Sequence, residues 1–321
     1  MMPSSAFFAE VAAAFRLGTP IAPPESIQGG LSNRLYRLVT DRGVFAVKRM
    51  VANAEAASFR LNVESAYRVE RLAMEAGILM PHPLPVASSG EALARISDGD
   101  APCWVRVHEW VPGEPVRARD VTHRDIETIA GVLARLHAIP APAVYASTAP
   151  STARDWRGSL PKDLASPDLL TTIALMEDMV QLGHTTSGPE RVMSHRDLDG
   201  KNVLRVSTGE LLLVDWDAAG PVVAEWDVVS TALDWSNVRN GDISTERFDL
   251  FLAAYVDGGG EPRPITTSSF AGWCEGVLDW LWFNLERSTD NDPYERDRGN
   301  AEMALTAWFM PPAARWMASY G

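Results

Sequence analysis

The stretch that most constrains the fold of this chain is residues 195–202, which read His-Arg-Asp-Leu-Asp-Gly-Lys-Asn. A short apolar, strand-like run follows at 211–214 and ends at Asp215. The fold must therefore present a carboxylate, an amide five residues later, and a second carboxylate just past the next strand. A phosphoryl-transfer enzyme needs these parts: one carboxylate orients a hydroxyl and accepts its proton, and the other two groups hold magnesium on a nucleotide's phosphates.

The spacing within this stretch assigns a role to each polar side chain. Asp197 is the predicted catalytic base, and the spacing Asp-x-x-x-x-Asn lets one tight loop present Asn202 to the same point. An amide oxygen is a hard ligand suited to magnesium. A buried aspartate without a cation or strong donors would be costly, so Asp215 is predicted to be a second magnesium ligand. Asp217 either supports these ligands or caps its own loop, and the residues leave both readings open.

Composition places the chain among globular proteins and limits its partners. The 321 residues give room for two lobes, and no apolar run reaches the length of a transmembrane helix. Two distant cysteines, Cys103 and Cys274, are what a reducing compartment tolerates, so we expect a cytoplasmic protein. We also expect it to be a monomer or homodimer. The net charge of −13 argues against nucleic acid or membrane partners. It fits a cationic substrate, but an ordinary acidic surface would explain it equally well.

The first part of the chain has the pattern of a small mixed lobe. Strand-like runs at 35–40 and 44–50 flank a turn signal, Asp-Arg-Gly. A helical pattern then covers 58–77, and two more strand-like runs follow at 92–96 and 103–111. The first 17 residues have the periodicity of a short amphipathic helix rather than the features of a signal peptide.

Beyond Pro112 the chain is mostly helical. Helices are predicted at 124–138, 167–182, 224–235, 246–256, 269–285 and 301–319. Two short strands near 203–205 and 211–215 interrupt them. We therefore expect an α+β fold with a nucleotide-binding lobe at 1–111, a hinge at about 108–113, and a helical lobe at 112–321 that carries the catalytic loop.

The first lobe should supply phosphate-binding groups. Lys48 ends an apolar strand, and a lysine there needs an anionic partner such as a nucleotide's phosphates, unless it is a surface lysine on an edge strand. Such a lysine is usually held by a glutamate of the next helix. Glu64 and Glu70 lie on different faces of that helix, and Glu64, closer to the edge of the apolar stripe, is the predicted partner.

A glycine pair precedes the first strand of this lobe. Residues 29–33, Gly-Gly-Leu-Ser-Asn, can fold over phosphates through their backbone amides, which would place Ser32 and Asn33 at the nucleotide. Paired glycines before a strand are also common in ordinary turns. The segment therefore supports a nucleotide site only together with Lys48.

These elements, in this order, resemble the aminoglycoside phosphotransferase and choline kinase superfamily, which shares the bilobal protein-kinase-like fold. The resemblance is carried by residues 29–33, 45–48, 77–85, 108–115, 133–137, 195–204 and 213–220. It implies that Lys48 binds the phosphates of ATP or GTP, and that Glu109, Trp110 and Val111 form the hinge that meets the purine. It also implies the roles given above to the catalytic base and to the two Mg²⁺ ligands.

Arg196 and Asp199 depart from the family's pattern. Arg196 stands where glycine is usual and restores the form seen in protein kinases, and Asp199 stands where histidine is common. In many protein kinases that arginine pairs with a phosphorylated activation loop. Only eleven residues separate Asp215 from Asp227 here, and none is Ser, Thr or Tyr. An interval this short leaves no room for a phosphorylated activation loop that docks a protein substrate. We therefore expect Arg196 to pair with Asp217 or Asp227, and the acceptor to be a small molecule.

The leading hypothesis is transfer of the γ-phosphate of ATP or GTP to a hydroxyl of an amine-bearing small molecule, with an aminoglycoside-type antibiotic favoured. Asp199 and Asp279 can attract an amine, and Trp280 and Trp282 can form an aromatic cage for a quaternary ammonium group, as in choline recognition. A tryptophan-rich helix is more often simply core. The alternatives are a choline, homoserine or sugar kinase of the same fold, or a non-catalytic, pseudokinase-like nucleotide-binding module.

Overall fold

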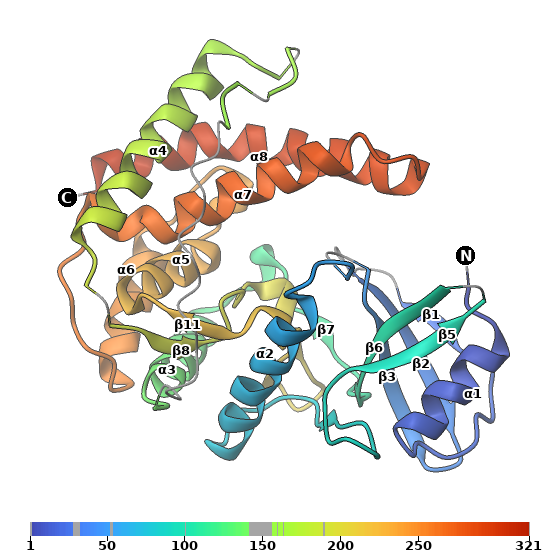
Figure 1. Ribbon diagram of the computed structural model, residues 1–321. Helices are drawn as coiled ribbons and strands as arrows, with labels where there is room; N and C mark the ends of the chain where they lie inside the picture. The colour runs from blue at the N-terminus through green and yellow to red at the C-terminus, as the bar shows by residue number, and fades with distance from the viewer. Residues whose placement is uncertain are drawn as a thin grey trace. The chain divides into compact units, whose positions relative to one another are not determined.

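The computed structural model of the protein describes residues 2–27, 33–51, 54–99, 101–140, 156–158, 160–162, 164–188 and 190–320 (Figure 1). The chain forms two compact units. Unit 1 comprises Met1–Pro115 and Lys201–Gly220, and unit 2 comprises Val116–Gly200 and Pro221–Gly321. Residues 201–220, which the sequence patterns assign to the helical lobe, thus belong to the unit that holds the sheet. None of the described helices combines the length and the apolar character needed to cross a membrane.

Unit 1 is built on an antiparallel sheet with the strand order β1-β2-β3-β6-β4, and β5 also pairs with β6. The strands are β1 (Glu25–Ile27), β2 (Arg34–Thr40), β3 (Gly43–Arg49), β4 (Pro83–Leu84), β5 (Ala94–Asp98) and β6 (Ala101–Glu109). The Asp-Arg-Gly turn joins β2 to β3, as predicted. Strand β3 therefore lies in the middle of the sheet, paired on both sides.

Helix α1 (Ser5–Ala14) packs its aromatic residues on this sheet. The hydroxyl of Ser4 caps the helix by accepting a hydrogen bond from the amide of Phe7 at 3.2 Å. Phe8 is 1% exposed, and its ring meets that of Tyr36 on β2 edge to face, with 5.4 Å between centroids. The predicted N-terminal amphipathic helix is therefore present and contributes to the core of the sheet.

Helix α2 (Phe59–Glu75) carries a buried stripe that includes one charged residue. Val63, Ala66 and Ala73 are buried, and Glu70 lies among them with 0% exposure. The spacing from Ala66 to Glu70 is one helical turn, so Glu70 shares the buried face. The helix is followed by Gly77, whose φ of +77° is the left-handed conformation common after a helix C-terminus.

A second small sheet in unit 1 carries the predicted metal ligands. Strands β7 (Glu114–Pro115), β9 (Val203–Arg205) and β10 (Leu211–Leu213) pair antiparallel in the order β10-β9-β7. Two 3₁₀ helices, η2 (Gly200–Asn202) and η3 (Trp216–Ala218), flank the β9-β10 hairpin.

Unit 2 is helical, with one short strand pair, β8 (Val192–Ser194) and β11 (Gly220–Val222). Its helices are α3 (His123–His137), α4 (Pro167–Thr186), α5 (Ala224–Trp235), α6 (Thr245–Asp257), α7 (Ala271–Arg287) and α8 (Pro293–Ser319), with 3₁₀ helices η1 (Ala118–Asp120), η4 (Val238–Asn240) and η5 (Thr267–Phe270). Helices α7 and α8 run side by side, and α4 packs on α7 (Figure 1). The predicted α+β fold class, with an antiparallel sheet followed by helices, is confirmed.

Candidate active site

The β9-β10 hairpin of unit 1 places the predicted metal ligands at the ends of neighbouring strands. Leu213 pairs with Val203, and the amide of Val214 donates to the carbonyl of Asn202 at 2.9 Å. Asn202 therefore lies just before β9 and Asp215 just after β10, at the same end of the hairpin. An amide and a carboxylate are oxygen ligands of the kind Mg²⁺ takes when nucleotide phosphates complete its coordination, so the residues present fit the predicted metal.

The backbone of Asp215 is in an unusual conformation. Its φ of 66° and ψ of 56° lie in the left-handed region, which residues other than glycine adopt rarely. Its side chain is 44% exposed, whereas Asn202 is 5% exposed. A strained residue persists only where the surrounding structure holds it in place, and such residues are common at functional sites.

Lys48 points from β3 toward two carboxylates. Its Nζ lies 2.5 Å from Asp215 Oδ1 and 2.5 Å from Asp217 Oδ2, and its side chain is 13% exposed. Burial opposes the charge of Lys48, but the attraction of the two carboxylates outweighs it and raises the pKa of Lys48 above its ordinary value. Since β3 is a central strand and Lys48 is largely buried, the surface-lysine reading is wrong.

The predicted pairing of Lys48 with Glu64 is also wrong. The Glu64 carboxylate instead accepts hydrogen bonds from the backbone amides of Ala92 and Leu93, both at 3.0 Å. Glu70 bonds Arg106 and His108. The lysine charge is met by Asp215 and Asp217 after β10, which leaves both glutamates of α2 for other partners.

Arg106 on β6 is the charged residue of this cluster that the sequence reasoning missed. It is 1% exposed, and its guanidinium bonds Asp217 Oδ1 at 2.5 Å through Nη1 and Glu70 through Nη2. Burial disfavours the carboxylate of Asp217, but Lys48 and Arg106 hold the pKa of Asp217 well below its usual range. The same signal that marked Lys48, a cation within an apolar strand, was available at Val105-Arg106-Val107.

Asn33 supports this cluster from the start of β2. Its Nδ2 lies 3.4 Å from Asp217 Oδ2, and its Oδ1 accepts from the amide of Val51 at 2.9 Å. Ser32 and the glycine pair before it lie outside the described residues. Asp217 therefore contacts three side chains and is far more than a loop cap. The nucleotide roles of Ser32 and Asn33 stay predictions.

The predicted hinge lies at the end of β6. The amide of Glu109 donates to the carbonyl of His82, and that of Trp110 donates to the carbonyl of Val44, both at 2.9 Å. Both amides therefore donate hydrogen bonds within unit 1. Contact between the purine and Glu109, Trp110 or Val111 stays a prediction, and it would have to use groups other than those two amides.

In unit 2, a loop anchored on both sides carries the predicted catalytic base. His195 and Leu198 are buried, and Asp197 between them is half-buried. The Nε1 of Trp235 on α5 donates to the carbonyl of Leu198 at 2.8 Å. At the end of the loop, a Cβ on Gly200 would lie only 2.5 Å from the carbonyl oxygen of Val116, so this position requires glycine.

Replacing Trp235 by phenylalanine tests this anchor. The variant keeps a smaller aromatic ring but leaves the buried Leu198 carbonyl without its donor. We expect the free energy of unfolding to fall by about 1–3 kcal/mol. Urea unfolding measures this, with Trp308→Phe on α8 as the matched control because Trp308 is 59% exposed. Equal effects of the two substitutions would contradict the anchoring role.

A buried histidine joins three helices of unit 2. The Nε2 of His137 on α3 lies 2.9 Å from Asp227 Oδ2 on α5, and its Nδ1 lies 2.8 Å from the hydroxyl of Tyr255 on α6. Asp227 is therefore the hydrogen-bond partner of His137. The side chain of Arg196 is exposed. Its expected pairing with Asp217 or Asp227 stays a prediction.

Tyr255 gives this cluster a pH dependence. Burial, reinforced by the Asp227 carboxylate, raises the pKa of Tyr255 to about 12. The folded protein keeps a proton that the unfolded chain releases near its ordinary pKa of about 10. The contribution of Tyr255 to stability is therefore full below about pH 10 and is lost as the pH rises through about 12.

The matched variant is Tyr255→Phe, which does not titrate. We expect the difference in free energy of unfolding between wild type and variant to shrink between about pH 10 and pH 12. Urea unfolding at several pH values measures it, and all other titrating groups cancel in the difference. A difference that does not change with pH would contradict the raised pKa.

The predicted acceptor-side residues have ordinary contacts. Asp199 is paired with Arg239, whose Nε lies 3.2 Å from Asp199 Oδ2. On α7, Trp280 stacks on Phe283, and Trp282 Nε1 donates to Glu286 within the same helix at 2.9 Å. Trp280, Trp282 and Asp279 are half-buried, and their substrate roles stay predictions, as does that of Asp199.

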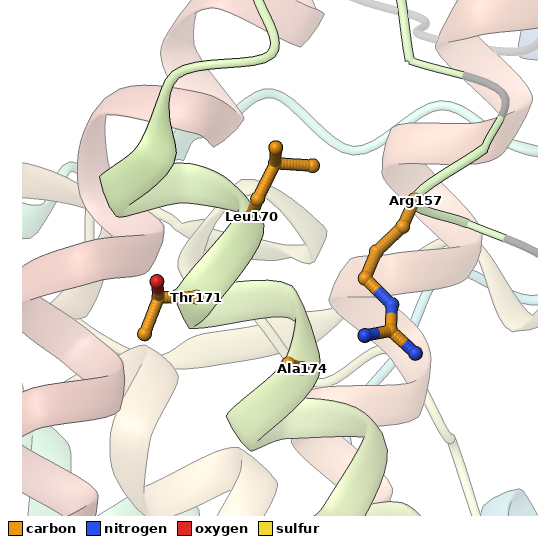
Figure 2. Close-up of a pocket in the computed structure, with 4 residues that line it drawn as sticks. All are labelled: Arg157, Leu170, Thr171 and Ala174. Carbon is orange, nitrogen blue, oxygen red and sulfur yellow. The ribbon is translucent and has the colours of Figure 1, made fainter.

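One surface depression of unit 2 is lined by none of the predicted site residues. Figure 2 shows Arg157 beside helix α4, from which the other lining residues, Leu170, Thr171 and Ala174, come. Arg157 Nε lies 2.9 Å from Glu177 of the same helix. The depression contains no pair of groups suited to acid-base chemistry, and we assign it no function.

Comparison with known proteins gives the family of the chain. The model of the phosphotransferase enzyme family matches residues 25–273, and the chain belongs to this family. The predicted superfamily and the predicted class, a phosphotransferase, are thereby confirmed. No curated protein matches the chain.

Several solved structures share the kinase-like fold. A spectinomycin phosphotransferase in complex with ADP and spectinomycin is 14% identical, with a TM-score of 0.64 over 91% of this chain and 93% of that one. A microcompartment-associated aminopropanol kinase is 16% identical, with a TM-score of 0.61 over 93% and 95%. A choline kinase from Streptococcus pneumoniae is 16% identical, with a TM-score of 0.57 over 94% and 98%. At these identities the likeness shows the fold.

Proposed function

We propose that this phosphotransferase moves the γ-phosphate of ATP or GTP to a hydroxyl of an amine-bearing small molecule, with an aminoglycoside-type antibiotic favoured. The observation that carries the proposal is the convergence of Lys48 and Asp215 in unit 1, next to Asn202 at the same end of the β9-β10 hairpin. One cation for phosphates and two oxygen ligands for a metal are the groups that a nucleotide site requires.

Each residue then has a stated role. Lys48 binds the phosphates, and Asp215 and Asn202 hold Mg²⁺. The metal, when bound, offsets the charge that develops on the phosphate oxygens. Asp197 accepts a hydrogen bond from the acceptor hydroxyl, orients its oxygen toward the γ-phosphate, and takes its proton as the new phosphate ester forms. The leaving nucleoside diphosphate carries away the electron pair of the broken P–O bond.

The small-molecule acceptor follows from the short interval between Asp215 and Asp227, which leaves no room for a segment that docks a protein substrate. The family's kinase-like neighbours include an aminopropanol kinase and a choline kinase, whose named substrates carry a hydroxyl and a nitrogen cation. The net charge of −13 is compatible with a cationic acceptor. The same charge supports a protein without a nucleic-acid or membrane partner, and we propose a cytoplasmic monomer or homodimer.

A screen of matched acceptors tests the proposal. Formation of ADP or GDP is measured with aminoglycosides, choline, ethanolamine, homoserine and sugars. The pair 1-amino-2-propanol and 1,2-propanediol differs only in that a hydroxyl group replaces the amine. We expect kcat/KM to be at least about tenfold higher for the amine, the effect of one good charged contact. Equal values for the pair would favour a sugar or other neutral acceptor.

A further inference from the structure

A buried cation, Arg106, and a largely buried one, Lys48, lie directly opposite each other in the central sheet. In the register of β3 and β6, Lys48 is paired with Arg106. Like charges opposite each other on neighbouring strands are destabilising, and buried charges require partners. This pair can persist only with anions close to both side chains.

Asp217 is the anion that serves both. Its Oδ2 lies 2.5 Å from Lys48 Nζ, and its Oδ1 lies 2.5 Å from Arg106 Nη1. Each carboxylate oxygen thus has its own cation. The other arm of the Arg106 guanidinium bonds Glu70 on α2. The four side chains form a continuous series, Glu70, Arg106, Asp217 and Lys48.

The geometry of this series depends on an arginine. A planar guanidinium presents donors in a fixed fork, so Arg106 bonds one carboxylate from α2 and another from η3 at the same time. Glu70 is held further by His108 Nε2 at 2.8 Å, and Arg106 lies over the ring of Tyr67 with 5.8 Å to its centroid. The compact ammonium of a lysine could not reproduce this fork.

Lys48 has two carboxylate partners with different surroundings. Asp215 is 44% exposed, whereas Asp217 is 17% exposed and is fixed by Arg106. If Lys48 turns from Asp215 to a nucleotide's phosphates, Asp217 is the partner that keeps its ammonium in place. In protein kinases the corresponding lysine is held directly by a glutamate of the neighbouring helix.

We propose that Arg106 is a positioning residue for nucleotide binding: it fixes Asp217, which in turn holds Lys48, so that Glu70 of α2 acts on Lys48 through two intermediate side chains. The proposal rests on the proposed function, because it takes Lys48 as the phosphate-binding residue. With 1% exposure, Arg106 has almost no surface for direct contact with a nucleotide or an acceptor.

The test compares Arg106→Met and Arg106→Lys, each in the wild-type background and in the Lys48→Met background. Dissociation constants for Mg-nucleotide and KM for the acceptor are measured. Arg60→Met is the control, because Arg60 is an exposed arginine of the same unit whose only ion pair among the described residues is with Glu91 on the surface. Circular dichroism and thermal unfolding check that each variant is folded.

We expect both Arg106 variants to weaken nucleotide binding by about 10- to 100-fold, the usual effect of removing a group that orients a binding residue. The KM for the acceptor should stay within about twofold, and Arg60→Met should match the wild type. In the Lys48→Met background the effect of either Arg106 substitution on nucleotide binding should disappear. Should Arg106→Met fail to fold, Arg106→Lys and Glu70→Gln carry the same comparison.

Equal effects of the Arg106 substitutions in both backgrounds, or unchanged nucleotide binding in Arg106→Lys, would overturn the positioning role. In either case a Lys48→Met protein with weakened nucleotide binding would leave the proposed function intact. Unchanged nucleotide binding in Lys48→Met would overturn the assignment of Lys48 to the phosphates, and the positioning role of Arg106 with it.

Discussion

Replacing Asp197 by asparagine should lower kcat by about 10²- to 10⁴-fold, the usual contribution of a positioned general base. The amide keeps the volume of the side chain but cannot take the acceptor's proton. Nucleotide binding should be retained within a fewfold, since Lys48, Asn202 and Asp215 supply the contacts to the metal and the phosphates. Steady-state kinetics and a separate measurement of nucleotide affinity distinguish the two effects.

The matched control for this substitution is Asp168→Asn. Asp168 lies in the first turn of α4, is 68% exposed, and pairs with Arg315 at 3.6 Å. It has the same chemistry as Asp197 without any role in the site, so its variant should keep wild-type kinetics. An Asp197→Asn protein with kcat within about threefold of the wild type would show that another group takes the proton.

Replacing Asp215 by asparagine should have an effect of similar size on activity, but through weaker metal binding rather than through loss of the general base. The change removes the charge of the predicted metal ligand and one of the two carboxylates next to Lys48. We expect kcat/KM to fall by about 10²- to 10³-fold, as when a group that stabilises developing charge is lost. Because the variant should bind the metal more weakly, the concentration of Mg²⁺ needed for half-maximal rate should also rise.

A Mg²⁺ titration of wild type and Asp215→Asn separates this prediction from general damage. Lys48 keeps Asp217 as a partner in the variant, so the sheet should remain folded and a thermal unfolding scan should show it. Asp168→Asn again serves as the control. An unchanged Mg²⁺ requirement in the Asp215 variant would contradict its role as a metal ligand.

The parts of the site that the sequence predicts are those encoded by local spacing. Asn202 and Asp215 flank one hairpin, so the distance between them in the chain determines where they emerge. Lys48 also follows from local pattern, since a cation in an apolar strand must find an anion. Helices, turns and strands can be predicted for the same reason, because hydrophobic periodicity and the residues that end an element are properties of neighbouring positions in the chain.

The partners of these residues could not be predicted from local spacing. Glu64 and Glu70 sit on one helix, and the choice between them depends on how that helix packs on β6. The buried stripe turned out to include Glu70, with Arg106 opposite it, and Glu64 instead caps two amides of the chain before β5. The anion that meets Lys48 comes from a segment about 170 residues away, as the separation of 169 between Lys48 and Asp217 shows. Such pairings depend on the three-dimensional fold, so the residue patterns of a single sequence do not reveal them.

The central claim is transfer of a phosphoryl group from a nucleotide to a small-molecule hydroxyl. The most direct measurement is ³¹P NMR of wild-type protein incubated with Mg²⁺, ATP or GTP, and an amine-bearing alcohol that the screen selects. We predict one new phosphate-ester signal for each nucleoside diphosphate formed, and no such signal with Asp197→Asn. Nucleotide that binds but is never turned over with any acceptor, or diphosphate formed only together with free phosphate, would contradict the claim.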